Sequence, residues 1–100
     1  DMVQDTRSAG AHPIVGTIPP VNPSFADRNP TERNDWVRRM NDLIRQMATQ
    51  ERAQVAEIHG EFLKQPSLPP LFADFLHPND AGFRVIARSF FEAITKPSAP

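Results

Sequence analysis

Two short apolar segments stand on either side of one long helical segment, and this order limits the folds that are open to the chain. Residues 13–18 form a β-rich run that ends at Pro19-Pro20, and residues 53–58 form a second candidate strand with Val55 and Ile58 as its core positions. Two strands that are joined through a helix pair in parallel. We therefore expect an α/β fold in which helices cover the faces of a parallel sheet.

The long helix between the strands has a clear start. In Asn29-Pro30-Thr31-Glu32, Asn29 can cap the helix, Pro30 suits the first helical position, and Glu32 stands where a capping box places its acid. The helix should run to about Thr49. Its apolar face repeats at spacings of three and four and consists of Val37, Met40, Ile44, Met47 and Ala48.

Further helices are expected towards both ends. Residues 2–9 are typical of a helix end that stops near Gly10, and residues 59–64 of a short helical turn. The last helix should begin at Asn79 or Asp80, run to about Ile94 and be ended by Pro97. We expect its buried stripe to consist of Phe83, Ile86, Ala87, Phe90 and Ile94.

Two strands are too few for a parallel sheet to stand alone, because such a sheet needs cover on both faces and further neighbouring strands. The composition is nevertheless that of a folded protein, with 39% hydrophobic and 23% charged residues. One hundred residues suffice for a small domain or for part of a larger one. We therefore expect the C-terminal portion of a larger α/β domain, or a chain that must pair with another chain.

Composition excludes several classes of function. The 11 basic and 12 acidic residues nearly cancel and the basic ones are scattered, which argues against nucleic acid as a partner. No apolar run is long enough to span a bilayer. The absence of cysteine removes disulfides, thiol nucleophiles and thiolate metal sites. No signal peptide is visible, but the chain opens at Asp1 without Met, so we expect its natural start to be missing and the compartment stays unknown.

The clearest chemical signal is the nine-residue run Asp74-Phe75-Leu76-His77-Pro78-Asn79-Asp80-Ala81-Gly82. A carboxylate three residues before a histidine can accept the proton on Nδ1 and leave Nε2 free as a general base. Pro78 stiffens the exit, and Asn79 or Asp80 caps the following helix, so the histidine stands on a fixed backbone. The spacing alone also fits a helix start with an incidental acid and histidine nearby.

The run resembles the last conserved block of the SGNH (GDSL-type) hydrolases, D-x-x-H-P-n-x-x-G. The likeness extends upstream in the same order. Ile14-Val15-Gly16-Thr17-Ile18-Pro19-Pro20 resembles the penultimate strand of that family with its T-x-P-P run, and Met40-Asn41-Asp42-Leu43-Ile44-Arg45 to Ala48 resembles the following helix. Residues 55–62 resemble the last strand and the segment after it.

The resemblance implies a serine ester hydrolase with a flavodoxin-like three-layer α/β/α fold, acting on a small ester and using no cofactor. His77 would be the general base and Asp74 its orienting acid. The G-D-S nucleophile block of the family, and the blocks that supply its oxyanion glycine and asparagine, have no counterpart in this sequence. Residues 1–100 would then be the C-terminal portion of a single SGNH-hydrolase domain. An N-terminal complement of the same enzyme, or a second chain, would carry the nucleophile.

Other candidate residues have weaker patterns. None of the serines stands on a glycine-flanked turn between a strand and a helix, as a nucleophile would; they are Ser8, Ser24, Ser67, Ser89 and Ser98. Phe75 and Leu76, with the neighbouring Leu71 and Phe72, either bind an acyl group or pack the loop onto the body. Asn41 is expected to make a structural hydrogen bond to a loop, and Trp36 to lie in the core or cover a helix.

Two alternatives to the hydrolase stay open. The chain is also compatible with a non-catalytic binding or assembly module that keeps a remnant SGNH fold and completes the exposed faces of its two strands by self-association. A metal hydrolase using His12, His59, Asp74 and His77 is the weaker idea, because their spacing fits no standard ligand pattern. The sequence defines neither the acyl nor the alcohol part of a substrate, nor the oligomeric state.

Overall fold

The two expected strands pair in parallel at the centre of the molecule. In the computed structural model, which describes residues 1–96, β1 (Ile14–Gly16) lies beside β2 (Gln54–Ala56), with Val15 opposite Val55. Backbone hydrogen bonds continue the pairing at both ends, from Gln54 N to Pro13 O (3.2 Å) and from Thr17 N to Ala56 O (3.0 Å). The predicted α/β class and the parallel pairing are confirmed, although both strands are shorter than the apolar runs that contain them.

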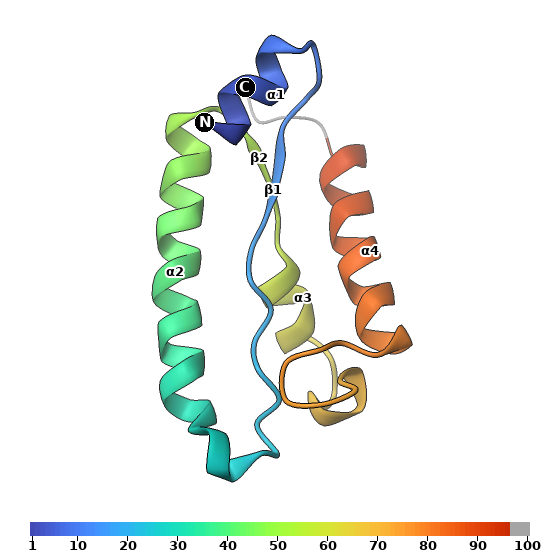
Figure 1. The fold of residues 1–100 in the computed structure, drawn as a ribbon. Coiled ribbons are helices and arrows are strands. Elements are labelled where there is room, and N and C mark those ends of the chain that lie inside the picture. Colours follow the sequence, from blue (N-terminus) through green and yellow to red (C-terminus); the bar gives the residue numbers. More distant parts are fainter. Residues whose placement is uncertain (97–100) are drawn as a thin grey trace.

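Helices form the outer layers (Figure 1). The long helix α2 (Pro30–Gln50) lies on one side of the strands, and α4 (Asp80–Thr95) lies on the other. The shorter elements are α1 (Met2–Ser8), α3 (Ile58–Leu63) and two 3₁₀ turns, η1 (Ala26–Arg28) and η2 (Pro69–Leu71). The molecule therefore has the three-layer α/β/α arrangement that was expected. Among residues 1–96, no helix combines the length and the apolar character needed to cross a membrane.

Helix α2 begins where the sequence predicts, with Pro30 in its first turn, but its cap is different. Asn29 has a left-handed backbone (φ 51°), and its side chain accepts no hydrogen bond from the helix. The expected side-chain cap at Asn29 is therefore wrong. Asn29 is the single residue between η1 and α2, and its left-handed backbone joins the two helices. Asparagine tolerates this conformation better than most residues.

The inner face of α2 carries a polar residue at its centre. Val37 and Ala48 are buried as expected, and between them Asn41 is only 1% exposed. Asn41 accepts a hydrogen bond from Ile18 N (2.7 Å) and donates one to Ile18 O (2.9 Å). The expected structural role of Asn41 is confirmed: it fastens α2 to the segment that leaves β1.

Helix α4 starts at Asp80 and is capped by Asn79, as predicted, but its buried stripe is rotated from the expected one. The residues that it buries are Gly82, Val85, Ser89 and Ala93. Ile86 and Phe90 are half-buried, whereas Phe83, Ala87 and Ile94 are exposed, so the expectation is wrong for these three. Small side chains let the helix lie close to its neighbours, and the large apolar ones therefore flank the contact or point outward. The Phe90 ring itself fills the space beside Gly16, where a Cβ would come within 3.1 Å of it.

A hydrophobic core cluster lies at the carboxyl end of the sheet. It joins α3, η2 and α4 and consists of Ile58, Phe62, Leu71, Phe72 and Val85. Phe62 is fully buried, and its ring centre lies 5.8 Å from that of Phe72. Leu71 and Phe72 belong to this cluster, so apolar packing anchors the chain just before the segment that carries Asp74 and His77. Pro97, expected to end α4, and Ser98 lie outside the described residues.

Candidate active site

Asp74 and His77 contact each other directly. Nδ1 of His77 lies 2.9 Å from Oδ2 and 3.1 Å from Oδ1 of Asp74. Oδ1 also accepts the backbone N–H groups of Leu76 (2.9 Å) and His77 (2.7 Å). The carboxylate therefore orients both the imidazole and the turn of backbone that carries it.

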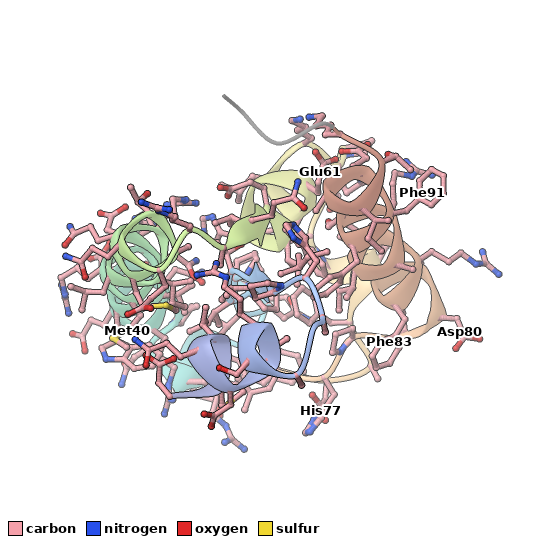
Figure 2. The ribbon with its side chains drawn as sticks, turned by 90° about the horizontal axis from the view of Figure 1, so that it is seen from above. Met40, Glu61, His77, Asp80, Phe83 and Phe91 are labelled. Carbon is pink, nitrogen blue, oxygen red and sulfur yellow. The ribbon has the colours of Figure 1, made fainter. Side chains whose placement is uncertain are left out.

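These contacts define which histidine nitrogen is basic. The backbone N–H of His77, then that of Leu76, and then the His77 side chain lower the pKa of Asp74 from 3.8 to about 2. Asp74 is thus ionised at neutral pH and can only accept hydrogen bonds, so Nδ1 of His77 must be the donor. In the neutral imidazole, the lone pair is then on Nε2. The His77 side chain is 76% exposed and projects outward from the body of the protein (Figure 2).

A short antiparallel link closes the loop that bears the pair. Ala73 N donates to His77 O (2.7 Å), and Phe72 and Pro78 form an isolated β-bridge. Asn79 ends the loop in two ways: its Oδ1 accepts from Gly82 N (3.1 Å) as the cap of α4, and its Nδ2 donates to Pro70 O (2.7 Å). The predicted fixed backbone around the histidine is therefore present. Residues 73–78 are called the base loop below.

Gly82 is required by a close backbone approach. A Cβ on this residue would lie 2.3 Å from Leu71 O and 2.7 Å from Pro78 Cβ. Leu71 O already accepts the N–H of Asn79 (2.9 Å). The first turn of α4 can therefore press against η2 only if position 82 has no side chain, which explains why the nine-residue run ends in glycine.

Asn22 makes contacts with the base loop that the sequence did not predict. It lies 4% exposed in the segment after β1, its N–H donates to Phe75 O (3.0 Å), and its Nδ2 donates to Asp74 O (3.3 Å). Its Oδ1 accepts from both the N–H and the hydroxyl of Ser24. Asn22 thus fastens the base loop to the segment that follows β1. Nothing in the local sequence separates it from an ordinary loop asparagine, because its partners lie more than fifty residues away.

Phe75 and Leu76 of the base loop differ in their exposure. Phe75 is 7% exposed, its ring meets Phe25 edge-on at 6.0 Å, and the guanidinium groups of Arg28 and Arg33 lie 5.9 and 5.5 Å from its centre. Leu76 is 51% exposed. Phe75 packs the loop against residues 25–33, whereas Leu76 is available at the surface.

The remaining candidates lie apart from this pair. His12 is exposed and hydrogen-bonded to Gln54 (2.6 Å). His59 is buried, and its pKa is lowered by that burial first and then by the positive charges of Arg45 and Arg38. In the part of the chain that the structure describes, no three His, Cys, Asp or Glu side chains gather closely enough to hold a metal ion, so the metal-site alternative lacks its ligand set.

The serines with defined contacts are occupied by other partners. The hydroxyl of Ser24 donates to Asn22 Oδ1 (2.8 Å), and that of the buried Ser89 donates to Val85 O (2.9 Å). Ser8 and Ser67 are exposed. Trp36, expected in the core or over a helix, is 51% exposed and lines a cavity together with Leu76.

Comparison with known proteins agrees with this architecture. A solved structure, a member of the lipolytic protein G-D-S-L family from Veillonella parvula, superimposes with a TM-score of 0.68 at 20% sequence identity. The match covers 96% of this chain and 51% of that one, so this chain spans about half the length of the solved protein. At this identity the likeness shows a shared fold. A comparison with curated proteins found no match.

The sequence model of the GDSL-like lipase/acylhydrolase family matches residues 1–85. That range includes both strands and the whole base loop. The resemblance recognised in the nine-residue run is therefore confirmed, and this chain belongs to the GDSL-like lipase/acylhydrolase family.

Proposed function

We propose that this chain is the base-and-acid-bearing segment of a serine carboxylic-ester hydrolase. Membership of the family supports an esterase or acylhydrolase type of activity. The observation that carries the proposal is the pair in the base loop: an ionised Asp74 holds Nδ1 of His77 and leaves Nε2 facing outward. A nucleophilic serine and the oxyanion donors come from an N-terminal complement of the same enzyme or from a second chain. Without that complement, the chain should be inactive.

The proposed reaction has two halves. Nε2 of His77 takes the proton of the serine hydroxyl while its oxygen attacks the ester carbonyl carbon. Collapse of the tetrahedral intermediate breaks the C–O bond, and the leaving alcohol takes the proton from His77. Water then attacks the acyl-enzyme, again giving a proton to His77, which returns it to the serine as the acid departs. Asp74 stays ionised and stabilises the imidazolium in both halves.

The neighbours of the pair have separate parts in this proposal. Leu76 contacts the substrate, because it is exposed beside His77. Phe75 is also predicted to contact the substrate. It lines a cavity of about 250 Å³ together with Asp74, His77, Phe25 and Arg28. Its burial means that it also keeps the base loop in position.

The test uses the chain alone and the chain reconstituted with a G-D-S-bearing N-terminal complement, assayed on p-nitrophenyl butyrate. We expect no turnover from the chain alone and turnover from the complex. His77→Ala in the complex should lower kcat by roughly 10³-fold or more, since the general base is lost. His12→Ala is the matched control: it removes another exposed histidine and should leave kcat unchanged. Near-normal turnover by the His77→Ala complex would refute the assignment.

A second candidate function is a non-catalytic assembly module. The observation that favours it is the outer side of α4, where Phe83, Phe91 and Ile94 are each more than half exposed. A second copy of the chain could cover them. Light-scattering mass after size exclusion separates the two functions. A stable homo-oligomer that no fluorophosphonate probe labels, even with the complement present, would favour the module.

A further inference from the structure

A cavity lies between α2 and the segment that leaves β1, and it is separate from the contacts of the Asp74–His77 pair. Its volume is about 560 Å³, within the range of small-molecule sites. The walls are mainly apolar and include Ile18, Pro19, Pro20, Val21, Trp36 and Leu76. It is called the Trp36 cavity below.

The walls of the Trp36 cavity are held in place before any ligand arrives. Asn41 makes two hydrogen bonds to the backbone of Ile18, at 2.7 and 2.9 Å. Asn34 accepts the N–H of Val21 (2.8 Å). Two amide side chains of α2 thus fix both ends of the Ile18–Val21 wall, with two prolines between them. A preformed wall lowers the ordering cost of binding.

Leu76 connects the Trp36 cavity to the proposed chemistry. It lines this cavity and also the smaller one that Asp74 and His77 line. An ester carbonyl at Nε2 of His77 could therefore extend an attached chain past Leu76 into the Trp36 cavity. Both cavities lie beyond the carboxyl end of β1, the side of a parallel sheet where ligands bind in folds of this type.

The charges around the Trp36 cavity favour a neutral ligand. The charged residues that line it are Glu32 and Arg33, one acid and one base, which cancel formally. The Arg33 guanidinium is also occupied, since its Nε donates to Arg28 O and its Cζ lies over the Phe75 ring, 5.5 Å from the ring centre. The remaining surface suits a hydrocarbon chain better than an anion or a cation.

We propose that the Trp36 cavity binds the hydrocarbon chain of the ester substrate, so that the enzyme prefers esters with a hydrocarbon chain of several carbons over methyl acetate. This inference rests on the proposed function and specifies its substrate. The hydrocarbon chain can belong to the acyl or to the alcohol part of the ester, and the second experiment below distinguishes the two.

The first experiment uses the chain alone, in which Trp36 is the single tryptophan. Titration with methyl octanoate or octyl acetate should shift the Trp36 emission to shorter wavelength in a saturable way. Leu76→Ala should weaken the apparent affinity about tenfold, because apolar wall is removed. Leu63→Ala is the matched control, since Leu63 is similarly exposed but lies on α3 outside the cavity. A response that is absent, or that Leu76→Ala leaves unchanged, would overturn the inference.

The second experiment uses the reconstituted complex and compares kcat/KM for methyl octanoate, octyl acetate and methyl acetate. A preference of at least tenfold for methyl octanoate places the acyl chain in the cavity, and the same preference for octyl acetate places the alcohol chain there. Equal values for all three esters would overturn the inference. The binding titration needs no turnover, so a failed His77→Ala test and a failed titration are separate results.

Discussion

Asp74 accepts two backbone N–H groups of its own loop in addition to the imidazole of His77. Its pKa in the folded chain, about 2, lies below the ordinary 3.8. A carboxyl whose pKa falls on folding stabilises the native state above its unfolded pKa. That contribution is complete above about pH 4 and is lost as the pH falls through the folded value. Acid therefore loosens the base loop through Asp74.

The loop is also held from outside by Asn22, which gives a residue-scale prediction. Asn22→Ala removes the donor to Asp74 O and should loosen the turn whose N–H groups keep the Asp74 carboxyl ionised. We expect the pKa of Asp74, followed by carboxyl ¹³C NMR, to rise from about 2 towards 3.8. The loss of this buried contact should also lower the unfolding free energy by roughly 1–3 kcal/mol.

Ser24→Ala is the control for that change. It removes the hydroxyl that donates to Asn22 Oδ1 but leaves both hydrogen bonds from Asn22 to the base loop. The pKa of Asp74 should be the same as in the unmodified chain. If Asn22→Ala also left the titration unmoved, Asn22 would have no part in positioning the acid.

At the scale of elements, the contact between α4 and η2 depends on Gly82. Gly82→Ala would place a methyl group 2.3 Å from Leu71 O, so either the helix or η2 must shift. We expect destabilisation of roughly 1–3 kcal/mol in urea unfolding, together with weaker amide protection at Asn79. Gly60→Ala is the matched control. The nearest atom to its new Cβ would be 3.9 Å away, and alanine in α3 should stabilise by about 0.5–1 kcal/mol. Equal effects of the two changes would contradict the close-approach argument.

The sequence predicted the order, type and approximate bounds of these elements because periodicity and local helix signals are properties of neighbouring residues. It did not predict which side of α4 is buried. The predicted stripe consists mainly of large apolar side chains, whereas the close packing of the helix buries the small residues Gly82, Ser89 and Ala93. The predicted side-chain cap of α2 is wrong for a related reason, because the preceding turn η1 determines the backbone conformation at Asn29. Asp74 and His77 were identified because their contact is local, whereas Asn22 depends on the tertiary fold.

At the scale of the whole molecule, α4 has a buried stripe and a second, exposed apolar stripe that is displaced from it by about one residue around the helix. One faces α3, η2 and the sheet, and the other presents Phe83 and Phe91 to the outside; Figure 2 shows Phe91 on the outer side of the helix. Under the proposed function, the N-terminal complement covers this second stripe, since exposed apolar area of this kind is typical of an interface.

Phe83→Lys and Phe91→Lys together test that idea. Both side chains are more than half exposed, so the unfolding free energy of the chain alone should change by no more than about 0.5 kcal/mol. Binding to the complement, measured by isothermal calorimetry, should weaken at least tenfold. Trp36→Lys, a change at another half-exposed aromatic residue on α2, should leave that affinity within about threefold. Unchanged affinity in the double variant would place the complement elsewhere.

In the proposed enzyme, the spacing of Asp74 and His77 also affects how the catalytic centre is assembled. Only two residues separate the acid from the base, and a loop this short closes with little loss of chain entropy. Their encounter needs no search through the rest of the chain. In the proposed enzyme, the entropic cost of assembly therefore falls almost wholly on the approach of the nucleophile, and the acid–base half can be correctly formed before that approach begins.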